Sequence, residues 1–169
     1  MRTESKRYIH YLAALVGAAI LTIIDQVTKH IVLVNLKGNE PFVIWEGVFQ
    51  LEYLENRGAA FGLFQNQRIF FLASAAIISI VVVIFYLRVP MNRRFLPLRL
   101  CAVGIIAGAW GNCIDRIRLN YVVDFLYFKL IDFPIFNVAD IYVTVSTFML
   151  AILICFYYKE EDLERIFHR

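Results

Sequence analysis

Four long apolar runs dominate the pattern of hydrophobic and polar positions along the chain. An α-helix needs roughly 20 apolar residues to cross a bilayer. The third run is rich in glycine and alanine, which favours close packing against neighbouring helices. The pattern predicts a bundle of four transmembrane helices with short connections. The predicted spans are at about residues 8–28, 69–88, 98–116 and 139–158.

The first run follows a short basic segment, as the apolar region of a cleavable signal peptide would. It is long for such a region, however, and it continues into the polar residues 25–29. A cleavage site would need small residues there. We therefore interpret the first run as a retained transmembrane helix.

The segment at about residues 40–66, between the first two runs, has the character of β-structure. Residues 42–45 and 48–54 are rich in aromatic and β-branched side chains, and Glu46 and Gly47 separate them. This predicts a small sheet or hairpin at the membrane surface, where Trp45 fits an interfacial aromatic belt. At the other end of the chain, residues 159–169 are expected to form a short exposed helical extension.

Composition supports a single membrane-embedded domain over residues 1–169. Hydrophobic residues make up 60% of the chain, and the mean hydropathy is +0.65. Ordinary soluble domains are about 45–50% apolar. The fold class expected is an α-helical integral membrane protein with four transmembrane helices and a small outward-facing β-sheet. The net charge of +3 is too small to indicate nucleic-acid binding.

The basic residues predict the orientation of the bundle. They gather before the first run, between the second and third, and after the fourth, and an even number of spans places these three groups on one side. Lys and Arg are enriched in cytoplasmic loops. Both termini are therefore expected in the cytoplasm, with residues 31–68 and 117–138 facing outward.

Cysteine and histidine give no sign of a metal or disulfide site. The three cysteines lie in apolar runs, and an odd number without close pairing argues against a disulfide framework. The three histidines are scattered along the chain. We expect no metal and no cofactor, and a zinc enzyme is disfavoured.

Polar residues interrupt the apolar pattern at a few places, and the first is at residues 25–29. Asp25 and Lys29 are four residues apart, so they share a helix face and can pair. One interpretation is an ion pair at a helix end, with Lys29 extending to the surface. The other is a functional role, since ionisable residues inside a membrane are functional candidates. The spacing leaves both open.

Two further polar groups have equally open interpretations. Asn56 and Gly58 follow a predicted strand, where a turn is favoured over a functional role. Asn112, Asp115 and Arg116 lie at positions i, i+3 and i+4, so one helix face carries an amide, an acid and a base. A polar clasp between helices explains this face as well as a substrate contact does.

Asp124 and Asp140 are the strongest candidates for chemistry. Taken singly, Asp124 fits a surface turn, and Asp140 fits a helix cap, with Asn137 three residues before it. Together, they flank the return of the chain into the membrane at one face. Two carboxylates at close range share a proton, and such a pair can act as general base and general acid. Asp132 is interpreted as a loop residue.

Five motifs in this order resemble the bacterial lipoprotein signal peptidases (signal peptidase II). The resemblance runs from about Asp25 to the fourth span. One departure is visible, because Ala107 stands where the family often has a second glycine, and we expect it to affect only helix packing. The motifs are D-Q-x-T-K, N-x-G-A-A-F, G-N-x-x-D-R, V-V-D-F and F-N-x-A-D.

The resemblance implies an aspartic endopeptidase of the bacterial inner membrane, with its active site near the outer face. It implies that Asp124 and Asp140 are the catalytic pair. The substrate would be a prolipoprotein with a diacylglyceryl-modified cysteine, cleaved just before that cysteine. We expect a monomer whose only other partner is membrane lipid. Positions implied to hold the substrate or support the pair are Asp25, Lys29, Asn56, Gly58, Asn112, Asp115, Arg116 and Asn137.

Three other classes of protein are weighed against a peptidase of this kind. A transporter or channel would spread its acids through the depth of the membrane, whereas these acids gather at one face. A non-catalytic assembly factor would use the same polar groups as clasps between helices. A metallopeptidase would need clustered histidines, which the sequence lacks.

Overall fold

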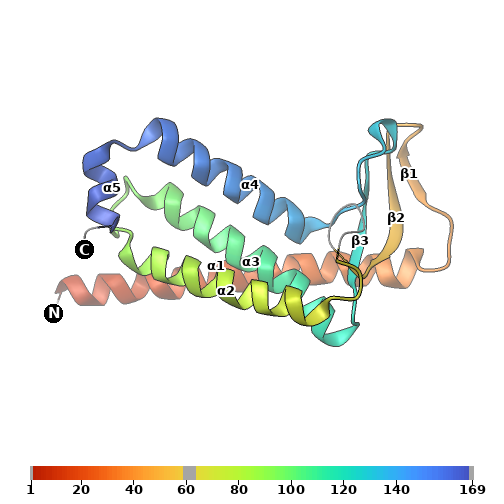
Figure 1. Cartoon of the computed structure of the whole chain (residues 1–169), viewed down its shortest axis with the longest axis horizontal. Coiled ribbons are helices and arrows are strands. Elements are labelled where there is room, and N and C mark those ends of the chain that lie inside the picture. Colours follow the sequence, from red (N-terminus) through yellow and green to blue (C-terminus); the bar gives the residue numbers. More distant parts are fainter. Residues whose placement is uncertain (1, 59–63, 168–169) are drawn as a thin grey trace.

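The computed structural model describes residues 2–58 and 64–167 and consists of a helical bundle with a small sheet at one end (Figure 1). Four of the helices are long and apolar enough to cross a membrane, which confirms the predicted fold class. The N-terminal end of α1 and the short helix α5 lie at the end of the bundle opposite the sheet (Figure 1). The four long helices are α1 (Arg2–Leu36), α2 (Arg68–Arg88), α3 (Leu96–Arg118) and α4 (Val138–Ile152).

The sheet contains three antiparallel strands in the order β1-β2-β3. The predicted hairpin forms as β1 (Phe42–Trp45) and β2 (Phe49–Asn56). The third strand, β3 (Val122–Tyr127), was missed, because the segment around Asp124 was expected to be a loop. Its residues from Val122 to Phe125 are all buried, so the strand lacks the alternation of apolar and polar positions that marks a half-exposed strand.

Helix α3 is the centre of the bundle and packs against α1, α2 and α4. Glycines make this close packing possible. A Cβ atom on Gly108 would lie 2.6 Å from Val143 Cγ2 of α4, and one on Gly111 would lie 2.5 Å from Asp25 Oδ2 of α1. Ala107, where the family often has glycine, is fully buried, and its carbonyl accepts a hydrogen bond from Thr22 Oγ1 at 3.3 Å.

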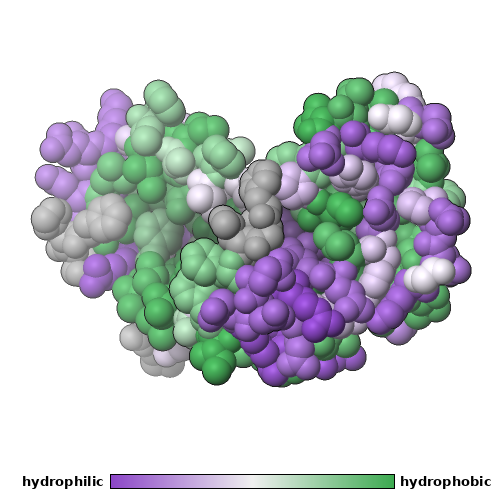
Figure 2. Space-filling model, turned by 45° about the vertical axis from the view of Figure 1, so that its right-hand side comes forward, coloured by the Kyte–Doolittle hydropathy of each residue, from purple (hydrophilic) through white to green (hydrophobic). Residues whose placement is uncertain are grey.

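The outer surfaces of the helices are apolar, as a lipid environment requires. Helix α2 has no buried residue and exposes Ile77, Ile80 and Val81. Figure 2 shows hydrophobic residues over the middle of the helical part, and hydrophilic residues at both ends of the molecule, with the larger number toward the sheet end. This division leaves the sheet end as the face where polar chemistry meets the membrane.

The C-terminal segment differs from the expected exposed extension. Helix α4 continues into η3 (Leu153–Tyr157), a π-helical turn, and α5 (Glu160–Phe167) then folds back on the bundle. Ile166 is 1% exposed, and Asp162 Oδ1 accepts a hydrogen bond from Arg94 Nε at 3.0 Å. The expectation of an exposed helix was wrong, because α5 has one apolar face and buries it.

Candidate active site

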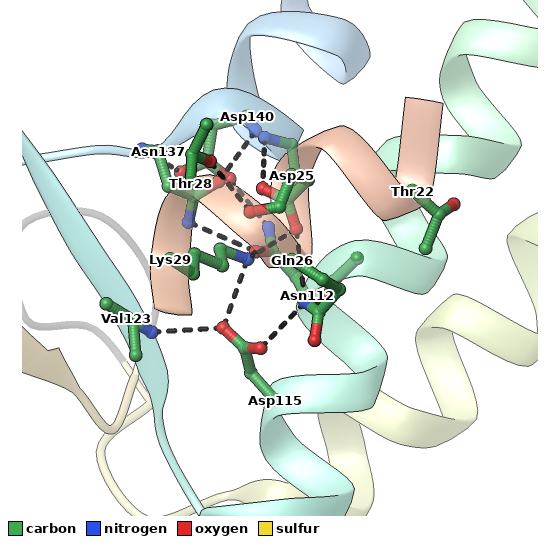
Figure 3. Close-up of polar contacts among 12 residues, drawn as sticks. Thr22, Asp25, Gln26, Thr28, Lys29, Asn112, Asp115, Val123, Asn137 and Asp140 are labelled. Atoms are coloured by element: carbon green, nitrogen blue, oxygen red, sulfur yellow. Dashed lines mark hydrogen bonds and ion pairs between the residues drawn. The ribbon is translucent and has the colours of Figure 1, made fainter. Parts of the chain in front are cut away.

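The polar residues singled out in the sequence converge where α1, α3, β3 and the N-terminus of α4 meet (Figure 3). A cavity of about 560 Å³ opens beside them. Both candidate carboxylates line it, and the rest of its wall is largely apolar. The lining residues are Asn56, Gly58, Phe71, Asn112, Arg116, Val122, Asp124, Phe133, Pro134, Ile135, Phe136, Asp140, Ile141, Thr144 and Val145.

A buried ion cluster next to this cavity joins α1 to α3. The Nζ atom of Lys29 lies 3.0 Å from Asp25 Oδ2 and 3.1 Å from Asp115 Oδ2. The predicted Asp25–Lys29 pair therefore forms, but Lys29 is only 3% exposed, so the interpretation in which it extends to the surface was wrong. A buried charge without a partner is strongly unfavourable, so these three groups depend on one another.

Gln26 completes the cluster and was not among the predicted site residues, although the D-Q-x-T-K motif contains it. Its Nε2 atom donates to Asp115 Oδ1 at 2.9 Å, to the Gly111 carbonyl at 3.1 Å and to Asp25 Oδ2 at 3.2 Å. The available signal was an amide within an apolar run, beside a charged residue. Spacing by three or four residues does not reveal it, because two of its three partners, the Gly111 carbonyl and Asp115, lie on α3.

Lys29 also fixes the orientation of the Asn112 amide. A lysine ammonium only donates hydrogen bonds, so the oxygen of Asn112 must face it, and the two atoms lie 2.8 Å apart. The Asn112 Nδ2 group consequently faces Asp140 and donates to its Oδ1 at 2.7 Å. Through Asn112 on α3, the ion cluster therefore determines which group donates a hydrogen bond to Asp140.

Asn137 links the two candidate carboxylates directly. It caps α4, and its Oδ1 atom accepts the Asp140 N–H at 3.0 Å, while its own N–H donates to Asp140 Oδ2 at 3.1 Å. This is a capping box. The Asn137 Nδ2 group donates to Asp124 Oδ1 at 2.6 Å and to Asn112 Oδ1 at 3.1 Å. Asp140 takes part in the helix cap as predicted, as the third residue of α4, whereas Asn137 is the N-cap itself. Asn137 thereby contacts both carboxylates.

Asp124 is the most buried group facing the cavity, with 1% of its surface exposed. It lies on a buried part of β3, so the surface-turn interpretation was wrong. Its Oδ2 atom accepts a hydrogen bond from Asn56 Nδ2 at 2.8 Å. Burial, followed by the nearby charge of Asp140, raises the pKa of Asp124 to about 7, although hydrogen bonds from Asn56 and Asn137 act in the opposite direction.

The helix face that carries Asn112, Asp115 and Arg116 serves more than one purpose. Asp115 binds Lys29 and also accepts the N–H of Val123 at 3.1 Å, which attaches β3 to the bundle. Arg116 donates to the Gly58 carbonyl at 3.0 Å, and its guanidinium lies 4.2 Å from the ring centre of Phe71. Asp115 therefore acts as a clasp between elements, and Arg116 on the same face lines the cavity.

The segment after β2 folds back on itself as far as it is described. The N–H of Gly58 donates to Asn56 Oδ1 at 2.9 Å, which is a local side-chain turn of the kind predicted. The remaining residues of the second motif, Ala59 to Phe61, lie outside the described residues. Asn56 thus takes part in the turn through its oxygen and in the Asp124 contact through its nitrogen.

Several cavity residues had no signal in the sequence. Phe71 lies on α2, Thr144 and Val145 lie on α4, and residues 133–135 belong to the connection into α4. Apart from Thr144 they are apolar, and only the fold brings them to the carboxylates. Within residues 2–58 and 64–167, no group of three or more His, Cys, Asp or Glu side chains has a geometry that holds a metal ion.

Comparisons with known proteins agree on one family. The family model described as signal peptidase (SPase) II matches residues 17–156. A lipoprotein signal peptidase of Streptococcus thermophilus is 44% identical over 149 residues, which cover 87% of this chain and 94% of that protein. A lipoprotein signal peptidase of Clostridium tetani is 42% identical over 146 residues, covering 84% and 90% respectively.

The fold is also similar to a solved bacterial membrane enzyme structure. That structure superposes with a TM-score of 0.76 at 30% sequence identity, and the match covers 88% of this chain and 92% of the other. The similarity includes most of both chains.

Proposed function

Because the chain belongs to the signal peptidase II family, we propose that Asp124 and Asp140 are the pair that hydrolyses the peptide bond. The family assignment makes the protein an aspartic-type hydrolase and a multi-pass protein of the bacterial inner membrane that removes signal peptides from prolipoproteins. It also confirms the resemblance inferred from the five sequence motifs. The assignment favours a peptidase over the transporter and assembly-factor alternatives.

The observation that carries the proposal is the bridge formed by Asn137. One asparagine contacts both carboxylates, with its Nδ2 group 2.6 Å from Asp124 Oδ1 and its backbone N–H 3.1 Å from Asp140 Oδ2. Both carboxylates also line the same cavity. The arrangement supports a pair that holds a single proton at neutral pH, since burial and the charge of Asp140 raise the pKa of Asp124 to about 7.

In the proposed reaction, water attacks the scissile carbonyl directly and no covalent enzyme intermediate forms. One carboxylate takes a proton from the attacking water, and the other, protonated, donates a hydrogen bond to the carbonyl oxygen. Asn56 and Asn112 each donate to one of the two carboxylates, at 2.8 and 2.7 Å, and thereby hold them in fixed orientations. Since the pair titrates as a unit, the two roles are not divided between the residues.

The cavity wall suggests how the substrate reaches the pair. Phe71 of α2 and Ile141 and Val145 of α4 form apolar parts of the lining, and both helices expose apolar faces to the membrane. We propose that the signal helix of the precursor enters sideways between α2 and α4. The diacylglyceryl group on the cysteine would remain at the lipid side, and cleavage would fall just before that cysteine.

The sheet is proposed to face outward and to cover the bound substrate. The cytoplasmic ends of the helices would be those beside α5, where the basic residues between α2 and α3 also lie. On the opposite side, Trp45 of β1 is 68% exposed and is available to contact a substrate. A photoactivatable group at Trp45 is expected to cross-link a bound precursor peptide, and failure to cross-link during turnover would contradict a clamp. Phe61, a second position suited to this test, lies outside the described residues.

The direct test of the pair is cleavage of a diacylated precursor by the Asp124→Asn and Asp140→Asn variants, followed by gel shift. Both substitutions keep the shape of the side chain and remove its ability to exchange a proton at neutral pH. Cleavage is expected to fall to background while both proteins remain folded. Asp132→Asn is the matched control, because Asp132 is exposed and is not among the residues lining the cavity. Normal processing by either of the first two variants would rule out the assigned pair.

A further inference from the structure

A second cavity, of about 170 Å³, lies beside the first and is lined by asparagine and arginine residues. We propose that it binds a phosphate group, supplied by the headgroup of a phospholipid or by soluble phosphate. Nothing in the proposed peptidase reaction requires such a site. The lining residues are Asn56, Arg57, Asn66, Arg68, Arg116 and Asn120.

The cavity has an excess of positive charge. Three arginines line it, and no carboxylate does. Of these three arginines, Arg57 is the one for which the described part of the chain shows an ion pair, since its Nη2 atom lies 3.1 Å from Glu55 Oε2. Among the described residues, the hydrogen bonds of Arg68 and Arg116 go to neutral oxygens. Arg116 lies close to the carboxylates of Asp115, Asp124 and Asp140, which offset its charge. Among the described residues, the charge of Arg68 has no such partner, and an anion with several oxygens matches the planar set of donors of its guanidinium.

Arg68 supplies the most specific indication of a ligand. Its Nη2 atom donates to the Ile117 carbonyl at 3.1 Å and its Nη1 atom donates to Asn120, so two of its nitrogens are satisfied at the end of α3. Its Nε atom is buried and has no hydrogen-bond partner among the described residues. A buried, unsatisfied donor on a charged group is unfavourable, so an acceptor in the cavity would stabilise it.

The end of α2 adds to the attraction for an anion. Arg68 is the first residue of α2, and the side chain of the preceding Gln67 makes no capping hydrogen bond. The backbone N–H groups of a helix N-terminus carry partial positive charge. This effect is secondary to the guanidinium groups, but it has the same sign and acts at the same place.

The surroundings favour a phospholipid as the source of the phosphate. Ile69, next to Arg68, is 82% exposed, and Phe64 and Phe70 stack on each other and are also exposed. A phospholipid offers a phosphate for the cavity and acyl chains for this apolar surface. Asn56 and Arg116 line both cavities, so an occupant would lie next to residues that contact Asp124 and Gly58.

The test is native mass spectrometry of the whole protein in a non-ionic detergent, with three probes. These are inorganic phosphate at constant ionic strength, phosphatidylglycerol, and diacylglycerol with the same acyl chains. Wild type is expected to retain one phosphatidylglycerol, and diacylglycerol is expected not to replace it. Arg68→Gln is expected to weaken this binding by about tenfold or more, since it removes a charge-assisted hydrogen bond.

Two further variants protect the test against misfolding and non-specific attraction. Asn120→Asp places a carboxylate against Arg68, so it should preserve the contact between α2 and α3 and still abolish binding of the probe. Aspartate tolerates the left-handed backbone at this position, where φ is 68°. Arg118→Gln removes an exposed arginine from the same end of α3 that does not line the cavity, and it should leave binding unchanged.

Each outcome decides the proposal. Displacement of the lipid by inorganic phosphate would support a site open to soluble phosphate, and its failure to displace, with specific lipid retained, would support the headgroup alone. Equal binding of diacylglycerol, equal loss in Arg118→Gln, or unchanged binding in Asn120→Asp would each overturn the proposal. Because binding is measured without turnover, the result is independent of the proposed catalytic pair.

Discussion

Replacing Asp124 with asparagine should make the protein more stable at pH 8 while abolishing its activity. The native state holds this carboxylate with 1% exposure, and its pKa rises from 3.8 to about 7, with burial as the largest cause and the charge of Asp140 as the next. The unfolded chain has no such environment. Ionising Asp124 at high pH is therefore a cost that the folded protein bears and that a neutral asparagine avoids.

The size of the effect follows from the shift in pKa. A change of about three units corresponds to about 4 kcal/mol at roughly 1.4 kcal/mol per unit. Asparagine recovers only part of this, because Asn56 and Asn137 both donate to Asp124, and one of them would then face another donor, at about 1–3 kcal/mol. The net gain at pH 8 is about 1–3 kcal/mol, or roughly 2–12 °C in Tm.

The direction of the pH dependence is a further check on the same reasoning. Between pH 3.8 and about 7 the native state binds a proton that the unfolded state has released, so the stability of wild type falls as pH rises through this window. The variant lacks this group, so its advantage should be present at pH 8 and absent near pH 4. Thermal unfolding in detergent at both pH values measures it, with Asp132→Asn as the exposed control. A loss of stability at pH 8 would refute the argument and would make Asp124 a structural residue.

Other predictions concern the groups around the pair. Asn56→Leu should raise the pKa of Asp124 further, by about one unit, and shift the acid limb of the pH–rate profile upward, since the lost hydrogen bond favours the ionised form; an unchanged profile would contradict it. Lys29→Met should lower stability by about 3–5 kcal/mol, measured as Tm, because it leaves buried acids unpaired. Gly108→Ala should lower Tm and the yield of folded protein, whereas Gly17→Ala, whose new Cβ would lie 3.6 Å from its nearest neighbour, should not.

The helices could be predicted because each membrane span corresponds to one continuous apolar run in the sequence. Hydropathy alone located the four long helices, and the i,i+4 spacing identified the Asp25–Lys29 pair, since both are local properties. Strand β3 could not be found in this way. It is buried on both faces between the hairpin and the bundle, and a short apolar run of that kind does not differ in pattern from a loop that lies against the membrane.

The candidate site was only partly visible for a related reason. The sequence shows that Asp124 and Asp140 are unusual in their surroundings, but it does not show that Asn137 contacts both. Gln26 and Phe71 were missed because their partners lie on other elements of the fold. Contacts between elements distant in the chain depend on the packing of α1, α2 and α4 on α3, and no spacing rule within one segment contains that information.

The ion cluster and the carboxylate pair are best understood as one unit with separate tasks. Lys29 lies between Asp25 and Asp115, and these two acids offset its positive charge. Lys29 therefore lowers the pKa of Asp124 less than burial and the charge of Asp140 raise it. What Lys29 does transmit is orientation, because its contact with the Asn112 oxygen turns the Asn112 amide nitrogen toward Asp140. If a nearby positive charge offset both carboxylates, both could ionise, and neither would hold the proton that the general acid needs. The cluster therefore aligns the carboxylates while leaving their mutual repulsion in place, which is the property that the proposed reaction needs.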